Sequence, residues 1–128
     1  MTRVLLVEDS VDVLSVLQIE LEGMGYQIDA VTNGHDALLA VQRNRPDIIV
    51  SDLRMPEMDG FDLIKRLRQS PRLGAVPAIA LTGASMEKDI EQALAFGFTA
   101  HLTKPVEAGE LVKKIEQLTV RRLRRKAG

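Results

Sequence analysis

The chain has 128 residues, 45% hydrophobic and 27% charged, which suits one ordinary folded domain and leaves little room for a second. It has no cysteine, which excludes disulfides and thiolate metal sites, and no apolar run approaches the roughly 20 residues of a membrane span. Of its 17 basic residues, five lie in residues 121–128, so residues 1–120 keep 12 basic and 18 acidic side chains and form an acidic body before a basic tail.

Short apolar runs alternate with amphipathic stretches along the chain. The run Val4–Val7 has no polar alternation, which is typical of a strand buried on both faces in a parallel sheet. Ser10 is placed to cap a helix that runs to about Glu22 and is ended by Gly23 and Gly25. The next expected elements are a strand at Gln27–Val31, a helix after Asn33-Gly34 that carries Ala37, Leu38 and Val41, and a strand at Asp47–Ser51 after Pro46.

The second half repeats this alternation after a turn-rich segment at residues 52–60, in which Asp59-Gly60 shapes the turn and caps a helix. Five strands alternating with five helices predict right-handed crossovers and an α/β fold, with helices on both faces of a parallel sheet. The remaining elements are a helix at about Phe61–Gln69, a strand at Ala75–Leu81 with Pro77 near its start, a helix at Ser85–Phe96 closed by Gly97, a strand at Thr99–Leu102, and a last helix after Pro105 with Leu111, Ile115 and Leu118 inward.

Polar side chains follow four of the five predicted strands. Glu8 and Asp9 follow the first strand, while Asp52, Thr82 and Lys104 follow the third, fourth and fifth. Ligands of open parallel sheets bind beyond the carboxyl ends of the strands, so these side chains are expected to converge. Three carboxylates brought together repel one another, and a hard cation with oxygen ligands, such as Mg²⁺, relieves that repulsion. Since a carboxylate is also a competent phosphoryl acceptor, the cluster predicts a site for phosphoryl chemistry.

The segments that carry these side chains resemble the receiver domains of two-component response regulators, the superfamily of the chemotaxis-type receivers. The resemblance covers about residues 3–118, and it implies a flavodoxin-like, doubly wound five-stranded sheet of order 2-1-3-4-5. Within it, residues 98–106 resemble the receivers of hybrid sensor kinases more than those of DNA-binding regulators. The matching segments are Glu8-Asp9-Ser10, residues 51–60 (SDLRMPEMDG), Leu81-Thr82-Gly83-Ala84 and Thr103-Lys104-Pro105.

The resemblance assigns the metal site and the phosphoacceptor. Asp52 matches the aspartate that takes the phosphoryl group and also binds the metal. Glu8 and Asp9 match the acidic pair that holds Mg²⁺, with Asp9 the more direct ligand. The backbone carbonyl of Arg54 matches the third protein ligand.

The resemblance also assigns the residues that respond to the phosphoryl group. Thr82 matches the hydroxyl that moves to bond it, and Lys104 matches the lysine that pairs with it. Pro105 matches the residue that often follows this lysine in a cis peptide. His101 falls where the family has a switch ring, usually Tyr or Phe. This departure leaves two interpretations open for His101, a half-buried packing residue or a polar, pH-sensitive switch.

The function implied is a Mg²⁺-dependent switch that receives its phosphoryl group on Asp52 from a histidine kinase or a histidine phosphotransfer protein. It is not an enzyme beyond assisting its own phosphorylation and dephosphorylation, and its downstream effector is not named by the sequence. Self-dephosphorylation is expected to be slow, because Arg54 and Ala84, two residues after Asp52 and Thr82, offer no carboxylate or amide to position water.

Val13 and Val16 lie off the helical stripe of Leu14, Leu17 and Leu21. They are either the margin of the core or, with Pro105, an exposed patch on which a partner helix bearing a histidine docks.

The residues of the cluster argue against three other functions. A flavin-binding electron carrier of this architecture needs a phosphate loop after the first strand, where Glu8 and Asp9 would repel phosphate, and aromatics are only 3% of the chain. A pseudo-receiver that acts only as an interaction module conflicts with the intact acidic cluster. A hydrolase lacks a dedicated nucleophile and base pair.

The basic tail and the start of the chain bear on partners and location. The tail is either a solvated end or a contact for nucleic acid or membrane, but no aromatic residue interleaves with its arginines. We therefore expect no direct nucleic-acid or membrane partner. The apolar stretch before Glu8 is too short for a signal peptide, which favours a cytoplasmic location.

Overall fold

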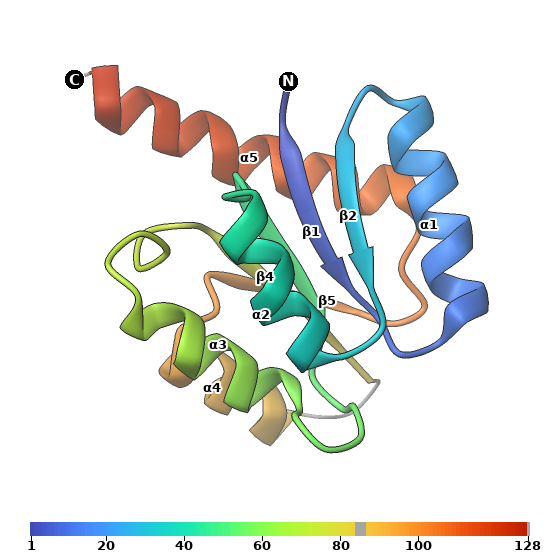
Figure 1. Cartoon of the computed structure of the whole chain (residues 1–128). Helices are drawn as coiled ribbons and strands as arrows, with labels where there is room; N and C mark the ends of the chain where they lie inside the picture. The colour runs from blue at the N-terminus through green and yellow to red at the C-terminus, as the bar shows by residue number, and fades with distance from the viewer. Residues whose placement is uncertain (84–86, 128) are drawn as a thin grey trace.

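Five strands and five helices alternate in the computed structural model, which describes residues 1–83 and 87–127 and the side chains of residues 1–83 and 87–119 (Figure 1). The strands are all parallel and follow the order β2-β1-β3-β4-β5, which confirms the predicted topology. The elements in chain order are β1 (Arg3–Val7), α1 (Val11–Gly23), β2 (Gln27–Val31), α2 (Gly34–Arg43), β3 (Ile48–Asp52), α3 (Gly60–Gln69), β4 (Ala78–Thr82), α4 (Glu87–Phe96), β5 (Ala100–Thr103) and α5 (Ala108–Ala127).

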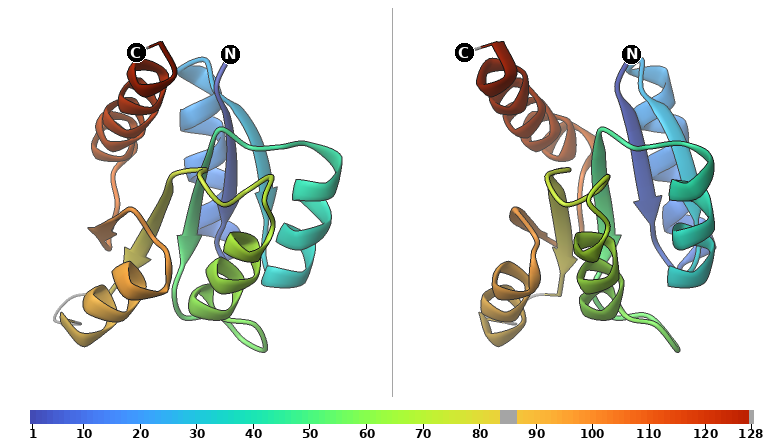
Figure 2. Two further views of the ribbon diagram at one scale, coloured as in Figure 1. Left: turned by 90° about the vertical axis from the view of Figure 1, so that its left-hand side faces the viewer. Right: turned by 60° about the vertical axis from the view of Figure 1, so that its left-hand side comes forward.

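Two layers of helices enclose the sheet, with α1 and α5 on one face and α2, α3 and α4 on the other (Figure 2). Successive residues of a strand point to opposite faces, so β1 places Val4 and Leu6 against α1 and α5, and Leu5 and Val7 against the other layer. Strands β1, β3 and β4 are buried on both faces, as their unbroken apolar runs predict.

Side-chain caps begin three of the helices at the ends of loops. The Ser10 hydroxyl accepts from the Val13 N–H at 3.4 Å and starts α1, as predicted. The Asp59 carboxylate accepts from the Asp62 N–H at 2.9 Å and starts α3, which confirms the capping role expected for Asp59-Gly60. Each cap directs the chain from the site's edge of the sheet back into a covering helix.

The predicted fourth strand was wrong at its start. We expected Ala75–Leu81, but the strand begins at Ala78. The Val76 N–H donates to the carbonyl of Leu73 at 3.2 Å, so the chain is still turning there. Pro77 has no N–H to donate, and it contributes only a carbonyl, which accepts from the Ile49 N–H at 2.9 Å.

Shifts of one residue affect two other predicted strands. The third strand is Ile48–Asp52 instead of Asp47–Ser51, and the fifth is Ala100–Thr103 instead of Thr99–Leu102. The described part of α4 begins at Glu87, and the predicted helix start at Ser85 lies outside the described residues. Because β3 and β4 end one residue later than expected, Asp52 and Thr82 are themselves the last strand residues.

The backbone of α5 is helical through Ala127 and projects beyond the sheet (Figures 1 and 2). The boundary expected between residues 120 and 121 therefore falls within a helix, and the separate character of the basic tail stays a prediction. Within the described part of the chain, no helix combines the length and the hydropathy of a membrane span.

Candidate functional site

The carboxyl ends of the parallel strands bring the predicted acidic cluster together. Glu8 and Asp9 directly follow β1, and Asp52 ends β3, which neighbours β1 in the sheet. One carboxylate oxygen from each of these three residues lies within 4.8 Å of the other two. The structure thus places at one point acids that are more than forty positions apart in the chain.

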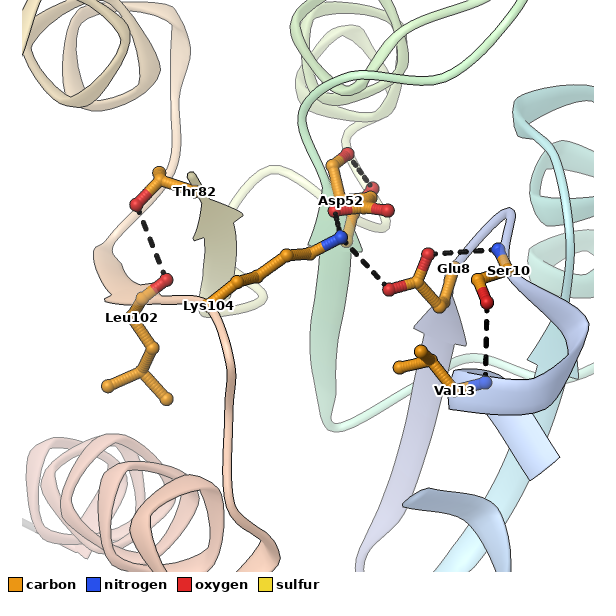
Figure 3. A network of polar contacts seen from close by, with 8 residues as sticks. Glu8, Ser10, Val13, Asp52, Thr82, Leu102 and Lys104 are labelled. Carbon is orange, nitrogen blue, oxygen red and sulfur yellow. Dashed lines mark hydrogen bonds and ion pairs between the residues drawn. The ribbon is translucent and has the colours of Figure 1, made fainter. Parts of the chain in front are cut away.

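Lys104 lies between two of these acids (Figure 3). Its Nζ is 3.0 Å from Oε1 of Glu8 and also forms an ion pair with Oδ1 of Asp52. The other oxygen of Glu8, Oε2, accepts from the Ser10 N–H at 3.1 Å. Glu8 and Asp52 are buried, with 0% and 3% of their surface exposed, whereas Asp9 is exposed at the mouth of the site. Two buried carboxylates therefore share one ammonium group as their ion-pair partner.

This arrangement separates the pKa values of the two buried acids. Burial raises the pKa of Asp52, and the adjacent Glu8 carboxyl outweighs the opposing effect of Lys104, so the pKa reaches about 8. Burial alone would raise the pKa of Glu8, but the adjacent Asp52 carboxyl, the hydrogen bond from the Ser10 N–H and the contact with Lys104 lower it to about 2. Burial disfavours the ammonium form of Lys104, yet both carboxylates together raise its pKa. The two buried carboxyl groups therefore titrate as a coupled pair beside one ammonium group.

The donor set fits a hard divalent cation. Oδ2 of Asp52 is buried and has no hydrogen-bond partner among the described residues. An orphaned buried carboxylate oxygen is costly unless a cation or donor meets it. Asp9 adds an exposed carboxylate nearby, and all the available ligands are oxygens. Mg²⁺ is the common ion that takes one or two carboxylates and keeps open positions for water or phosphate.

Thr82 and His101 are placed next to the cluster but not in it. The Thr82 side chain is buried, and its hydroxyl donates to the Leu102 carbonyl at 3.4 Å, on the side away from Asp52 (Figure 3). His101 is half-buried in β5, beside Ala80 of β4. In this arrangement Thr82 does not contact the predicted phosphoacceptor, and the switch roles of both residues stay predictions.

The loop after β3 carries a contact that the sequence did not predict. Arg54 donates two hydrogen bonds to Asp89 of α4, from Nη2 to Oδ1 at 2.6 Å and from Nε to Oδ2 at 3.2 Å. Asp89 is buried, and the only signal for it in the sequence is its place four residues before the buried Ala93, on the same face of the helix. The role of the Arg54 backbone carbonyl as a metal ligand stays a prediction, and Ala84 lies outside the described residues.

A groove of about 1020 Å³ adjoins the acidic cluster between α1 and the segment that leads from β5 to α5. Val13 and Val16 line it and are 44% and 55% exposed, so they are surface residues and do not belong to the core margin. Pro105 lines the opposite wall, and the peptide bond before it is cis. The three residues expected to dock a partner thus lie in one groove, and their docking role stays a prediction.

Comparison with known sequences gives one family. The family model described as "Response regulator receiver domain" matches residues 4–116. An uncharacterized 14.6 kDa protein of Leptolyngbya boryana is 42% identical over 114 residues, which cover 89% of this chain and 87% of that protein. Response regulator SaeR of Staphylococcus aureus is 34% identical over 121 residues, and here the chain spans only about half of the relative, 52% of its length.

Solved structures agree with the sequence comparison. The chemotaxis protein CheY4 of Vibrio cholerae is 30% identical, with a TM-score of 0.88 over 92% of this chain and 98% of that one. The receiver domain of sensor histidine kinase PA1611 from Pseudomonas aeruginosa is 31% identical, with a TM-score of 0.84 over 92% and 97% of the two chains. That receiver domain was solved with a magnesium ion coordinated in its active-site cleft.

Proposed function

The chain belongs to the response regulator receiver domain family, and from this premise we propose that it is a cytoplasmic switch that accepts a phosphoryl group on Asp52. The donor is the phosphohistidine of a histidine kinase or a histidine phosphotransfer protein. One observation carries the proposal: the buried Asp52 has one oxygen paired with Lys104, while the other has no hydrogen-bond partner in the described part of the chain and lies beside Glu8 and Asp9. Membership of a regulatory-domain family favours the switch over the flavin-carrier and hydrolase alternatives.

The residues of the site divide the work of phosphoryl transfer. Oδ2 of Asp52 is the free oxygen that forms the new bond to phosphorus, as the bond from phosphorus to the donor's imidazole nitrogen breaks and leaves neutral histidine after proton uptake. Lys104 is already at the acceptor and can pair with a phosphoryl oxygen, because its ammonium contacts Oδ1 of the same carboxylate. The site thus supplies fixed positive charge where the transferred group arrives.

Glu8, Asp9, Asp52 and the backbone carbonyl of Arg54 would hold Mg²⁺. When bound, the ion supplies charge neutralisation at the phosphoryl oxygens. Together with Lys104 it balances the three carboxylates before the phosphoryl group adds its roughly −1.5 to −2 charge. The magnesium-containing receiver domain of PA1611 supports this assignment by similarity.

Labelling with a small phosphodonor such as acetyl phosphate tests the proposal. We expect the intact mass to increase by one phosphoryl group in Mg²⁺ and not in excess EDTA. Asp9→Asn should weaken Mg²⁺ binding roughly tenfold or more, because it removes a charged ligand, and calorimetry measures that affinity. The matched control is Asp12→Asn, an exposed acid on α1 outside the cluster, which should leave the affinity unchanged. Labelling that is indifferent to Mg²⁺, or absent altogether, would return the pseudo-receiver to consideration.

The same site limits how fast the phosphoryl group is lost. Hydrolysis needs a water molecule oriented opposite the Asp52 oxygen. The Arg54 side chain is held by Asp89 and is a cation without an acceptor atom, so it cannot act as a base for that water. We therefore propose slow self-dephosphorylation and no enzymatic activity on other substrates.

Docking of the phosphodonor is assigned to the groove lined by Val13, Val16 and Pro105, which opens beside Asp9. Val13→Glu should slow phosphotransfer from a histidine donor at least about tenfold, because a charge would have to be buried against the partner helix. Labelling by acetyl phosphate and Mg²⁺ affinity should not change. Ile19→Glu is the matched control, since Ile19 is 71% exposed on the same helix but does not line the groove. Equal transfer rates in the two variants would count against docking at this groove.

A further inference from the structure

Helix α4 buries few large side chains within the part of it that the structure describes. Asp89 and Ala93 are its buried residues within the described segment Glu87–Phe96, while Leu94 and Phe96 are 48% and 43% exposed. The neighbouring α3, of the same length, buries four large apolar side chains: Phe61, Leu63, Ile64 and Leu67. At the end of the helix, the Phe96 ring packs edge-on against Phe61 of α3, with the ring centres 5.6 Å apart. Since an alanine buries little apolar area, the start of α4 is held in large part by what binds Asp89.

The partner of Asp89 is Arg54, which comes from the loop that directly follows the proposed phosphoacceptor. The contact is two-pronged, with 2.6 Å from Nη2 to Oδ1 and 3.2 Å from Nε to Oδ2. The guanidinium carbon also lies 5.6 Å from the centre of the Phe61 ring of α3, within the range of a cation–π contact. The Asp89 side chain is 9% exposed, so without Arg54 a buried carboxylate would be left unpaired. The pair therefore joins the first turn of α4 to the loop beside Asp52.

The position of Thr82 indicates which arrangement this pair favours. The Thr82 hydroxyl is bonded to the Leu102 carbonyl and does not face Asp52. Thr82 ends β4, and α4 begins five residues later with Asp89 in its first turn. For Thr82 to bond a group on Asp52, its hydroxyl must leave the Leu102 carbonyl and the end of β4 must adjust, which a first turn of α4 held by Arg54 opposes.

We propose that the Arg54–Asp89 pair is a latch that holds α4 in the arrangement seen here and that opens when Asp52 is phosphorylated. This inference rests on the proposed function, and it adds the residues that connect the site to α4. Asp89 acts through Arg54, as a positioning residue. If the Arg54–Asp89 contact exists only in the resting arrangement, it opposes any ligand that binds the phosphorylated arrangement. Removing the contact should then increase the affinity for such a ligand by the free energy of the contact.

The test uses Asp89→Asn, which keeps the shape of the side chain and removes its charge. Calorimetric titration with beryllofluoride, a phosphoryl mimic, in saturating Mg²⁺ should show an apparent Kd lowered roughly three- to tenfold, the range of a partly exposed two-pronged ion pair. The Kd for Mg²⁺ alone should stay within about twofold. Hydrogen exchange of the α4 amides in the unliganded variant should be faster than in the parent protein, with α2 unchanged. Asp29→Asn is the matched control, because Asp29 pairs with Arg3 at 3.1 Å in β2 and β1, at the edge of the sheet away from β4 and β5.

A double variant distinguishes the effect of the Arg54–Asp89 contact from the effect of changing either residue alone. In an Arg54→Gln background, Asp89→Asn should give no further tightening of beryllofluoride, because the shared contact is already lost. The latch is wrong if Asp89→Asn leaves beryllofluoride affinity and α4 exchange unchanged, or weakens the affinity. A change in Mg²⁺ affinity beyond twofold would also overturn it, since the pair would then organise the metal site. If the parent protein does not bind beryllofluoride, the proposed function fails, and the exchange of α4 amides still tests whether Asp89 holds the helix.

Discussion

Asp52→Asn abolishes labelling by acetyl phosphate in Mg²⁺, so that the intact mass of the variant stays that of the unmodified chain. The reason is chemical and not steric. Asparagine has nearly the same shape, but its amide offers no nucleophilic carboxylate oxygen to phosphorus. The orphaned oxygen of Asp52, Oδ2, is the atom replaced or neutralised by this change. Because a single atom is the acceptor, we expect complete loss of labelling and not a slower rate.

The matched control for this experiment is Asp36→Asn, in the first turn of α2 and outside the acidic cluster. Its labelling should equal that of the parent protein. Urea denaturation of both variants checks that neither has lost its fold. A phosphoryl group that still appears on the Asp52 variant, mapped to another residue by fragmentation, would defeat the assignment of the acceptor.

The acidic cluster could be predicted from the sequence because the ends of the strands determine which residues meet at the edge of the sheet. A run buried on both faces must end where polar residues begin, and parallel strands end at one edge of the sheet. Glu8 and Asp52 follow such runs in β1 and β3, which are neighbours in the sheet. The same reasoning misplaced the start of β4, because the apolar Val76 is buried in a turn and belongs to the core without being part of the strand.

Two features of the site depend on partners that no local pattern records. The Thr82 hydroxyl donates to the Leu102 carbonyl, and only the three-dimensional position of β5 brings that carbonyl within reach. Arg54 and Asp89 are 35 positions apart on a loop and a helix, and each alone is an ordinary charged residue. They pair because of how α4 is rotated about its own axis. The sequence does not determine that rotation, because the described part of α4 has few buried apolar residues.

Gly60→Ala is expected to be the most damaging single change near the site that does not remove a functional group. Gly60 begins α3, and its N–H donates to the Leu53 carbonyl at 2.8 Å, which brings the loop back against the end of β3. An added Cβ would overlap the backbone oxygen of Asp52 and lie 2.8 Å from Cα of Leu53. Both are backbone atoms of a buried strand end, so neither can swing away as a flexible side chain would.

The free energy of unfolding should therefore fall by about 3 kcal/mol or more in Gly60→Ala, at the upper end of what overpacking costs. In urea this is a lowering of the midpoint by roughly 1–2 M. Labelling by acetyl phosphate should fall as well, because relief of the overlap displaces the backbone of Asp52. Gly109→Ala is the matched control: nothing lies within 4 Å of its added Cβ in α5, and alanine should stabilise a helix there by up to about 1 kcal/mol. If the two alanine variants were equally stable, the close approach of Gly60 to Asp52 would not be what shapes this end of the strand.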